Sequence, residues 1–485
     1  MAELIIYQDD RCIRLLFQEP QPLHLLLEQA GILFSRPCAG RGICGKCAVR
    51  LSGQVSEPNE VEIAAGTRLA CQAIITGDAQ VWLPQEQKLR QIQINSIAQP
   101  ELKSPMAGKI GAAVDIGTTT VAVRRYSLQT GECLGESAMA NPQNSIAADV
   151  MGRIGAAMEG SLSKLQAQIT DTIYHLLQQA GGSADHMVIT GNTTMLYLLT
   201  GRNPENLSHA PFAADCLFDE EITLFGIPAY LPPCMNAFVG ADITCAVMFS
   251  QMCRNRTSLL CDIGTNGEIA LWKDGILHVT STAAGPAFEG AGISCGCSSI
   301  LGAIDKVTAQ NGQLVLHTIG EVPAVGLCGS GLIDAVAAMR HLQWLDETGA
   351  LKNDPVVLAP DVSVTQKDIR ALQLAKAAIA AGIETLMNLS DTKQEEIETL
   401  YLAGGFGSHL SMQSAAAIGL LPKKLVEKTT VIGNAALSGA AQILLNQKQI
   451  PELRKLAANS QHWNLGGNTV FQSCFMEQMF FPEEV

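Results

Sequence analysis

The sequence has few aromatic residues, no histidines in metal-binding spacing and no long apolar run. Aromatic residues make up 5% of the 485 positions, too few for a surface on which nucleic-acid bases stack. None of the nine histidines stands in an H-x-x-x-H or H-E-x-x-H arrangement, which argues against a mononuclear zinc site of that kind. No stretch reaches the roughly 18 apolar residues of a membrane-spanning helix, and the first residues do not resemble a signal peptide. We therefore expect a cytoplasmic protein.

The sequence also has fewer basic than acidic residues. Lysine and arginine number 32 against 46 aspartates and glutamates, which gives a net charge of -14. This balance repels phosphate backbones and anionic lipids, so neither nucleic acid nor a membrane is an expected partner. The 47% hydrophobic content and 44 glycines are typical of a folded globular chain rich in tight turns. Its length allows two to four domains.

Cysteine, in contrast, is plentiful and clustered. Because the cytoplasm keeps thiols reduced, the 15 cysteines are not expected to form a disulfide framework. Cys38, Cys44, Cys47 and Cys71 are separated by five, two and twenty-three residues. Three thiolates from one loop and a fourth from a distant segment form the ligand pattern of a 2Fe-2S cluster. The first gap of five residues resembles adrenodoxin-type ferredoxins, so these four cysteines are the predicted metal ligands.

The surroundings of this loop fit a β-grasp fold. Gly40, Gly42 and Gly45 let the backbone approach a cluster and aim its N–H groups at sulfur. Alternating residues predict strands near 4–8, 12–17, 47–55 and 79–84, and apolar spacing predicts a helix that ends at Gly31. The three glycines of this loop also match the dinucleotide-binding pattern G-x-G-x-x-G, but no strand-to-helix turn is predicted here, which argues against that function. The loop nearly matches a phosphate loop, but Cys47 replaces the hydroxyl residue that holds magnesium. A redox C-x-x-C pair and a structural zinc site remain alternatives.

A polar linker with two prolines is expected before a second module, which opens with a strand and a hydroxyl-rich turn containing Asp115, Gly117, Thr118 and Thr119. A similar turn with Asp262, Gly264, Thr265 and Asn266 lies 147 positions later. Such self-similarity indicates a duplicated fold, one copy in each half. Glycines let the backbone approach phosphates and the threonines supply donors. The two aspartates, the predicted catalytic residues, can hold hydrated Mg²⁺ and orient water.

A third glycine-rich turn follows the strand that begins at Thr399. Gly404 and Gly405 in this turn could let a purine lie flat against the backbone. The three motifs in this order resemble the superfamily of sugar kinases, heat-shock ATPases and actin. The predicted nucleotide-binding residues are Gly117, Thr118, Thr119, Gly264, Thr265, Asn266, Gly404 and Gly405.

The predicted fold class is α+β and α/β multidomain, with a β-grasp ferredoxin followed by a duplicated RNase H-like (actin-like) fold. The expected divisions are a ferredoxin domain (1–86), a linker (87–108) and the two ATPase halves (109–255 and 256–485). Between the halves, the nucleotide would touch both phosphate turns.

The combined architecture resembles the reductive activators of corrinoid proteins. The segments that carry this resemblance include Asn141 to Ile154, Glu289 to Gly296 and Ala403 to Gly407. It implies ATP-dependent transfer of one electron from a 2Fe-2S cluster, which converts cob(II)amide to cob(I)amide in a methyltransferase system. The implied cofactors are the cluster, ATP and Mg²⁺. The implied partners are a corrinoid protein and an electron donor, and the assembly could be a homodimer. One departure from the family is the short segment between the two modules, where members often have a longer linker domain.

Two other functions remain open at this point. A small-metabolite kinase with an accessory redox domain would form a phosphorylated product and depend little on the cysteines. An ATP-dependent activator of another low-potential enzyme would share the ATPase but act on a different acceptor. Fold alone does not decide among these, because one fold hosts many chemistries.

Overall fold

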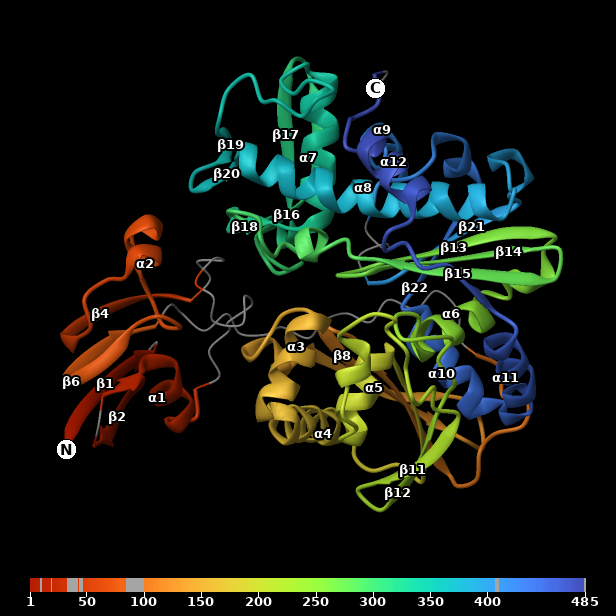
Figure 1. Cartoon of the computed structure of the whole chain (residues 1–485), viewed down its shortest axis with the longest axis horizontal. Helices are drawn as coiled ribbons and strands as arrows, with labels where there is room; N and C mark the ends of the chain where they lie inside the picture. Colours follow the sequence, from red (N-terminus) through yellow and green to blue (C-terminus); the bar gives the residue numbers. More distant parts are fainter. Residues whose placement is uncertain are drawn as a thin grey trace.

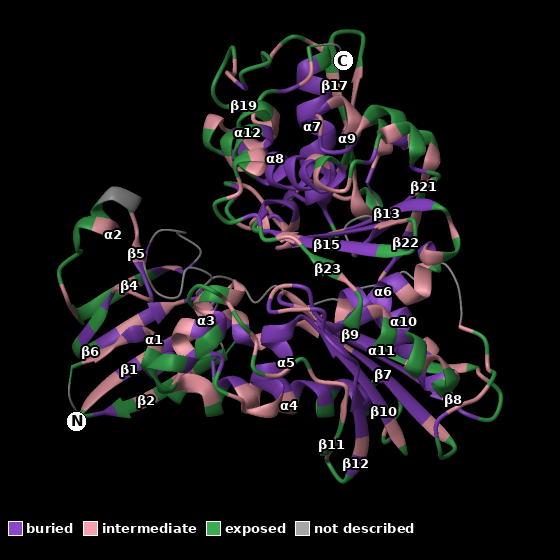
Figure 2. Cartoon of the chain, turned by 45° about the vertical axis from the view of Figure 1, so that its right-hand side comes forward, coloured by how far each residue is buried: buried purple, intermediate pink, exposed green. Residues whose placement is uncertain are grey.

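The computed structural model describes residues 1–8, 11–18, 20–32, 42, 47–83, 100–405 and 410–483. These residues form an N-terminal module and two larger halves, whose sheets lie one above the other in Figure 1. Strands of both large sheets are mostly buried, whereas exposed residues lie on the outer faces of helices (Figure 2). Among the described residues, no helix is both long and apolar enough to cross a bilayer.

The N-terminal module has the predicted β-grasp arrangement, with strand order β2-β1-β6-β4-β5 and β3 paired to β6. Leu23, Leu26 and Leu27 of α1 are fully buried against this sheet, because their spacing places them on one helix face. The prediction missed α2, where Asn59 and Glu62 form a capping box, and placed the start of the last strand too late. The elements are β1 (Ala2–Gln8), β2 (Arg11–Phe17), β3 (Gln21–Pro22), α1 (Leu23–Gln29), β4 (Ala48–Val55), α2 (Glu60–Ala65), β5 (Arg68–Leu69) and β6 (Ile74–Trp82).

The first large half is a six-stranded sheet of order β11-β12-β10-β7-β8-β9. Strands β7, β8 and β9 form an antiparallel meander, and β10 and β12 extend it in parallel with β7. The elements are β7 (Ile110–Ile116), β8 (Thr120–Ser127), β9 (Cys133–Ala140), α3 (Val150–Ala156), α4 (Leu162–Gln179), β10 (His186–Gly191), α5 (Thr193–Thr200), β11 (Glu220–Leu224), β12 (Ile227–Leu231) and α6 (Ala241–Ser250).

The second half repeats this pattern in the order β22-β21-β13-β14-β15-β23. Strands β13 to β15 form the meander, and β21 and β22 add in parallel. The predicted duplication is therefore confirmed. The main elements are β13 (Thr257–Ile263), β14 (Gly267–Lys273), β15 (Ile276–Thr282), β16 (Ala303–Gln310), β17 (Gln313–Thr318), β18 (Gly326–Leu327), α7 (Gly329–His341), β19 (Val356–Ala359), β20 (Val362–Val364), α8 (Gln366–Leu389), β21 (Thr399–Ala403), α9 (Met412–Ala417), β22 (Thr429–Gly433), α10 (Ala435–Leu445), α11 (Ile450–Ala458), β23 (Gln461–His462) and α12 (Thr469–Gln478).

Two helices tie the halves together. Helix α10, from the second half, packs on the first sheet, where Leu437 and Leu444 share a core with Ala113 of β7. Helix α6 packs against the second sheet and crosses α10 closely, since a Cβ at Gly439 would lie 2.3 Å from the Cys245 carbonyl oxygen. The start of α10 lies at the end of β7, where Asn434 bonds to Asp115, and Asp242 in the first turn of α6 lies near Asp115 and Asp262.

The segment before the first half is bound to it where it is described. The Met106 N–H donates to the Leu444 carbonyl oxygen at 2.9 Å, and the Met106 side chain is buried in the core beneath α10. Residues 84–99 lie outside the described part of the chain. The N-terminal module meets the first half through an ion pair of 2.6 Å between Glu28 of α1 and Lys164 of α4.

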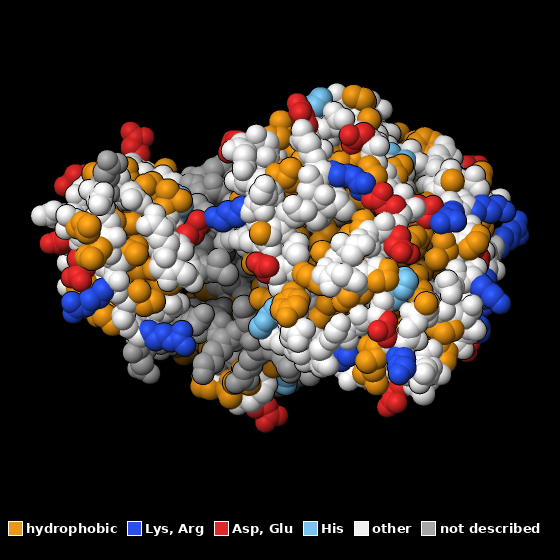
Figure 3. Space-filling model, turned by 90° about the horizontal axis from the view of Figure 1, so that it is seen from below, with side chains coloured by type: hydrophobic (Ala, Val, Ile, Leu, Met, Phe, Trp, Pro, Cys, Tyr) orange, Lys and Arg blue, Asp and Glu red, His pale blue; other side chains and the backbone are white. Residues whose placement is uncertain are grey.

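The surface carries charges of both signs. In the view of Figure 3, acidic and basic side chains alternate with apolar ones over the described residues, and no broad basic patch gathers on that face. This face therefore presents no single sign of charge to a polyanion.

Candidate functional site

Two of the four predicted cluster ligands are described, and they lie together. The Cys47 and Cys71 sulfurs are 3.2 Å apart, Cys47 buried after the loop and Cys71 partly exposed before β6. A hydrogen bond from the Cys47 thiol is the main cause that lowers the pKa of Cys71 to about 6. Thiolates are the metal-binding form of cysteine, so this pair fits a metal–sulfur site. Cys38 and Cys44 lie outside the described residues.

The surroundings of Cys71 add two further donors. The Gln72 amide lies 3.5 Å from the Cys71 sulfur, and the Gly42 backbone N–H also hydrogen-bonds to it. Gly42 has φ +76°, and a Cβ there would lie 2.6 Å from Val61, so only glycine fits. Such N–H contacts to sulfur tune the potential of an iron–sulfur centre.

The first phosphate turn joins β7 to β8. The Gly117 N–H donates to the Thr120 carbonyl oxygen at 2.9 Å, and a Cβ at Gly117 would lie 2.6 Å from that oxygen. The turn places Asp115 at its start and Thr119 at its tip. Thr118 is buried, and its hydroxyl accepts a hydrogen bond from Asn192 at 3.1 Å.

The second phosphate turn joins β13 to β14 in the same way. The Gly264 N–H donates to the Asn266 carbonyl oxygen at 3.1 Å, and Asp262 stands opposite Glu268 in the ladder. The two turns meet, since the Thr119 and Thr265 hydroxyls are 3.1 Å apart. The structure therefore brings together the two motifs that the sequence separates by 147 positions.

The third predicted motif is only partly described. Gly404 follows β21 with φ +94°, and a Cβ there would lie 2.7 Å from an Asp262 carboxylate oxygen. Gly404 thus lies beside the second phosphate turn. Among the described residues, none lies within 4 Å of a Cβ placed on Gly405. Residues 406–409 lie outside the described residues.

Acidic side chains gather where the halves meet. Burial raises the pKa of Asp115 to about 6, and burial together with the charge of Asp115 raises the pKa of Asp262 to about 7. Burial, followed by neighbouring carboxylates, also raises the pKa of Asp242 and Glu268. Carboxylates that crowd each other in this way are stabilised by a divalent cation.

Residues from both halves hold these groups in place. Asn434, the N-cap of α10, donates to Asp115 at 2.9 Å, so an amide from the second half fixes a carboxylate of the first. The Glu289 carboxylate accepts hydrogen bonds from the Thr119 and Thr265 hydroxyls. The turns are therefore linked by side chains as well as by packing.

A buried arginine lies behind the first turn. Arg153 of α3 is fully buried and donates to the Thr118 carbonyl oxygen at 2.5 Å. Burial lowers its pKa to about 9, which leaves the guanidinium charged at neutral pH. Its other hydrogen-bond acceptors are Gln143, Asn144, Ala147 and Met195.

Six residues at the nucleotide site were not among the predicted site residues: Arg153, Asn192, Asp242, Glu268, Glu289 and Asn434. Asp242 and Asn434 each begin or cap a helix after a glycine. That pattern is common and gives no sign that the two helices converge. Glu268 lies two residues beyond Asn266, and its spacing from Asp262 could have suggested it. Glu289 and Arg153 lie within segments that carry the family resemblance, which does not single out either side chain.

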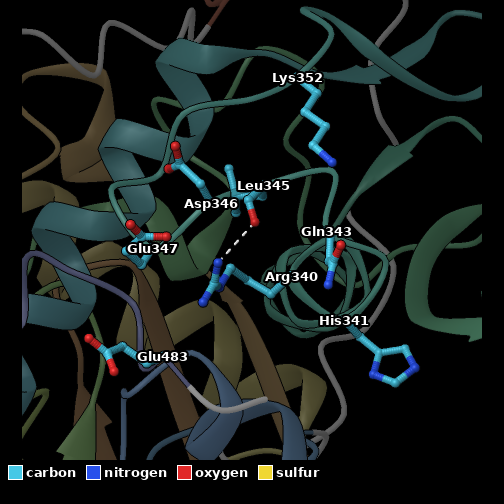
Figure 4. A pocket seen from close by; sticks show the side chains of 8 residues that line it. All are labelled: Arg340, His341, Gln343, Leu345, Asp346, Glu347, Lys352 and Glu483. Atoms are coloured by element: carbon cyan, nitrogen blue, oxygen red, sulfur yellow. Dashed lines mark hydrogen bonds between the residues drawn. The ribbon is translucent and has the colours of Figure 1, made fainter.

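Two other features lie apart from this site. A pocket of about 420 Å³ surrounds the end of α7, where Arg340 donates to the Leu345 carbonyl oxygen (Figure 4), and none of its lining residues is a predicted site residue. Among the residues that the structure describes, no three or more histidine, cysteine, aspartate and glutamate side chains have a metal-site geometry. The four-cysteine site falls outside that statement, because two of its members are not described.

Comparisons with known proteins agree with this architecture. Residues 7–76 match a 2Fe-2S iron–sulfur cluster binding domain, residues 110–255 match the RACo middle region, and residues 256–485 match the C-terminal ASKHA domain of RACo.

Relatives match over most of the chain. The corrinoid activation enzyme RamQ of Eubacterium limosum is 33% identical over 439 residues, which are 81% of this chain and 73% of the relative. The [Co(II) methylated amine-specific corrinoid protein] reductase of Methanosarcina barkeri is 25% identical over 76% of this chain and 77% of its own. A solved reductive activator for corrinoid, iron–sulfur protein has a TM-score of 0.72 and 26% identity, over 99% of this chain and 98% of its own.

The fold and the site define an iron–sulfur protein in which a 2Fe-2S ferredoxin domain is fused to an actin-like ASKHA domain. The chain belongs to the family of RACo-type reductive activators of corrinoid proteins. The predicted family and fold class are therefore confirmed.

Proposed function

We propose that this protein uses ATP to drive the reduction of a corrinoid protein from cob(II)amide to cob(I)amide. The observation that carries the proposal is the union, in one chain, of a cysteine pair suited to iron–sulfur ligation with two facing phosphate turns. An electron carrier needs ATP when the acceptor has a lower potential than the donor, because each ~59 mV costs a factor of ten for one electron. The relatives' printed activities support the corrinoid acceptor.

The N-terminal module supplies the electron. Cys38, Cys44, Cys47 and Cys71 would hold a 2Fe-2S cluster, which when bound is a one-electron donor. The Cys47 and Cys71 sulfurs are already within 3.2 Å, and the Gly42 N–H and Gln72 amide support charge on the Cys71 sulfur. These donors favour the thiolate over the protonated thiol.

The two halves would bind and hydrolyse ATP between them. Gly117, Thr118 and Thr119 on one side, with Gly264, Thr265 and Asn266 on the other, would contact the phosphates. Asp115 and Asp262 would hold hydrated Mg²⁺ and orient the attacking water. Gly404 and Gly405 would support the adenosine. The raised pKa values of both aspartates fit a cation-binding role, since Mg²⁺ offsets their mutual repulsion.

The domains that we propose are 1–86, a linker over 87–108, and halves at 109–255 and 256–485. The matched family regions support the two later boundaries. Packing of Met106 under α10 indicates that the end of the linker is fixed to the ATPase.

Anaerobic visible spectroscopy tests the proposal. Reduced protein is mixed with a corrinoid protein in the cob(II)amide state, with and without Mg-ATP, and a Cys71→Ser variant is measured in parallel. The proposal predicts the cob(I)amide band only with Mg-ATP and intact cysteines. ATP hydrolysis without that band, across several corrinoid proteins, would point to another acceptor. A phosphorylated small-molecule product would point to a kinase.

A further inference from the structure

The Glu289 carboxylate occupies the meeting point of the two phosphate turns. One of its oxygens accepts hydrogen bonds from Thr119 at 2.7 Å and from Thr265 at 2.8 Å. Its other oxygen is 3.8 Å from where a Cβ would stand on Gly264. One side chain thus engages both halves of the molecule through the hydroxyls at the tips of the turns.

Glu289 is carried by a short, tightly folded loop. The 3-10 turn Pro286–Glu289 is flanked by Gly285 and Gly290, which have φ of +76° and +77°. The Gly285 N–H donates to the Thr265 carbonyl oxygen at 2.9 Å, so the loop begins on the second phosphate turn. At its other end, a Cβ on Gly290 would lie 2.4 Å from the Cys297 carbonyl oxygen. The end of the loop is therefore packed directly on the backbone of Cys297, so a displacement of the Glu289 backbone would be passed to residues 290–297.

The contacts of Glu289 are those that a terminal phosphate needs. Hydroxyl groups at both turns would donate to phosphate oxygens, and here they donate to a carboxylate, which offers the same acceptor chemistry. Two anions cannot share these donors at hydrogen-bond distance without strong repulsion. When ADP is bound, the Glu289 carboxylate can keep its hydrogen bonds to the Thr119 and Thr265 hydroxyls. The γ-phosphate of ATP would compete with the carboxylate for the same hydroxyls.

We propose that Glu289 is a nucleotide gate, whose carboxylate joins the two phosphate turns and is displaced by the γ-phosphate of ATP but not by ADP. The displacement moves residues 285–297 and so reports the phosphate state to the surface of the second half. This role rests on the proposed nucleotide site. Arg153, fixed behind the first turn by its bond to Thr118, supplies positive charge for whichever anion occupies the gate.

Calorimetric titration of the full chain tests the gate without a corrinoid partner. Wild type and Glu289→Gln are titrated with Mg-AMPPNP and with Mg-ADP. Loss of the negative charge should raise the affinity for AMPPNP relative to ADP by about tenfold or more, the scale of a close like-charge contact. Glu477→Gln, which removes an exposed charge from α12, should leave the ratio as in wild type.

The outcomes separate the gate from the site on which it rests. If wild type binds both nucleotides but Glu289→Gln shows an unchanged or reduced ratio of AMPPNP affinity to ADP affinity, the gate is overturned. Glu289 would then only link the two turns structurally. Failure of wild type to bind either nucleotide would overturn the nucleotide site and the gate with it.

Hydrogen exchange of the wild-type protein tests the displacement of Glu289 without relying on a variant that must fold. The peptide that covers residues 285–297 should exchange faster with AMPPNP than with ADP, because only the γ-phosphate displaces Glu289. Equal exchange with the two nucleotides would contradict the displacement.

Discussion

The two phosphate turns have the same strand topology but are supported differently. The first is held from behind by side chains of its own half: Arg153 and Asn192 bind Thr118, and Asn141 donates to the Gly117 carbonyl oxygen at 2.9 Å. The second is held by backbone bonds of its own turn and loop. The Glu289 carboxylate accepts from both turns, at Thr119 and Thr265.

This difference separates a fixed turn from a responsive one. Buried side-chain networks resist displacement, because breaking them leaves unpaired polar groups. A carboxylate on a short loop can leave its hydroxyl partners and be solvated. Both turns keep their aspartate and both donate to the Glu289 carboxylate, but only the first also has a buried side-chain network behind it. Four substitutions test this comparison.

Arg153→Met should have the largest effect. It removes a fully buried guanidinium and leaves the Thr118 and Ala147 carbonyl oxygens unpaired, which should lower the free energy of unfolding by about 3–5 kcal/mol. Chemical denaturation measures this change. Arg256→Met is the matched control, because the Arg256 side chain is 83% exposed and its removal should change little. Equal effects of the two substitutions would show that the first turn is not held by the buried network.

Asp262→Asn should abolish most ATP hydrolysis while stabilising the fold. The rate should fall at least about 10²-fold, the scale of a group that acts in the transition state. The pKa of Asp262 is raised to about 7, so the folded state disfavours the charged form that dominates in the unfolded chain above about pH 4. A neutral amide removes that cost near neutral pH, and the melting temperature should rise. Asp274→Asn, at the exposed turn after β14, is the control. A stable variant that retains full activity would exclude Asp262 from catalysis.

Asn192→Ala should weaken the support of the first turn moderately. Asn192 caps α5 by accepting from the Met195 N–H at 2.9 Å and also donates to Thr118. Loss of an N-cap costs about 1 kcal/mol, which urea unfolding can resolve. Asn192→Asp keeps the capping oxygen but loses the amide donor, so it separates the cap from the contact to Thr118. If the alanine variant were as stable as wild type, the contact would not support the turn.

Asn434→Ser keeps a side-chain oxygen that can cap α10 but loses the amide donor, and it should have the smallest effect, a shift of the pH profile. The Asn434 amide opposes the rise in the pKa of Asp115, which burial places at about 6. Its removal should raise that pKa further, so the acidic limb of kcat/KM for ATP hydrolysis should move to higher pH by a fraction of a unit. In an Asp115→Asn background the shift should vanish. A shift to lower pH, or one that persists in that background, would assign the limb to another group.

Much of the architecture could be predicted from local sequence. The spacing of Leu23, Leu26 and Leu27 defines α1, and Asn192 marks the start of α5 because its side chain caps the helix. The two Asp-Ile-Gly-Thr turns indicated the duplication, since each is a complete hairpin signal in adjacent residues. Cysteine spacing indicated the cluster in the same way.

The rest of the candidate site consists of residues that are far apart in sequence and are brought together only by the tertiary fold. Asn434 reaches Asp115 across 319 positions of sequence, and it does so because α10 leaves its own half to pack on the first sheet. Glu289 reaches Thr119 across 170 positions. Neither residue carries a local pattern that differs from an ordinary helix cap or loop acid, so single-sequence reasoning had no signal with which to select them.

Freeze-quench EPR on one sample tests the coupling of the two modules most directly. Protein with a reduced 2Fe-2S cluster is held with a cob(II)amide-loaded corrinoid protein, Mg-ATP is added, and both paramagnetic signals are followed in time. The account predicts that the cluster and cob(II)amide signals decay together, only after ATP addition, and not in Asp262→Asn. Decay at the same rate without ATP, or loss of one signal without the other, would contradict ATP-driven transfer from cluster to cobalt.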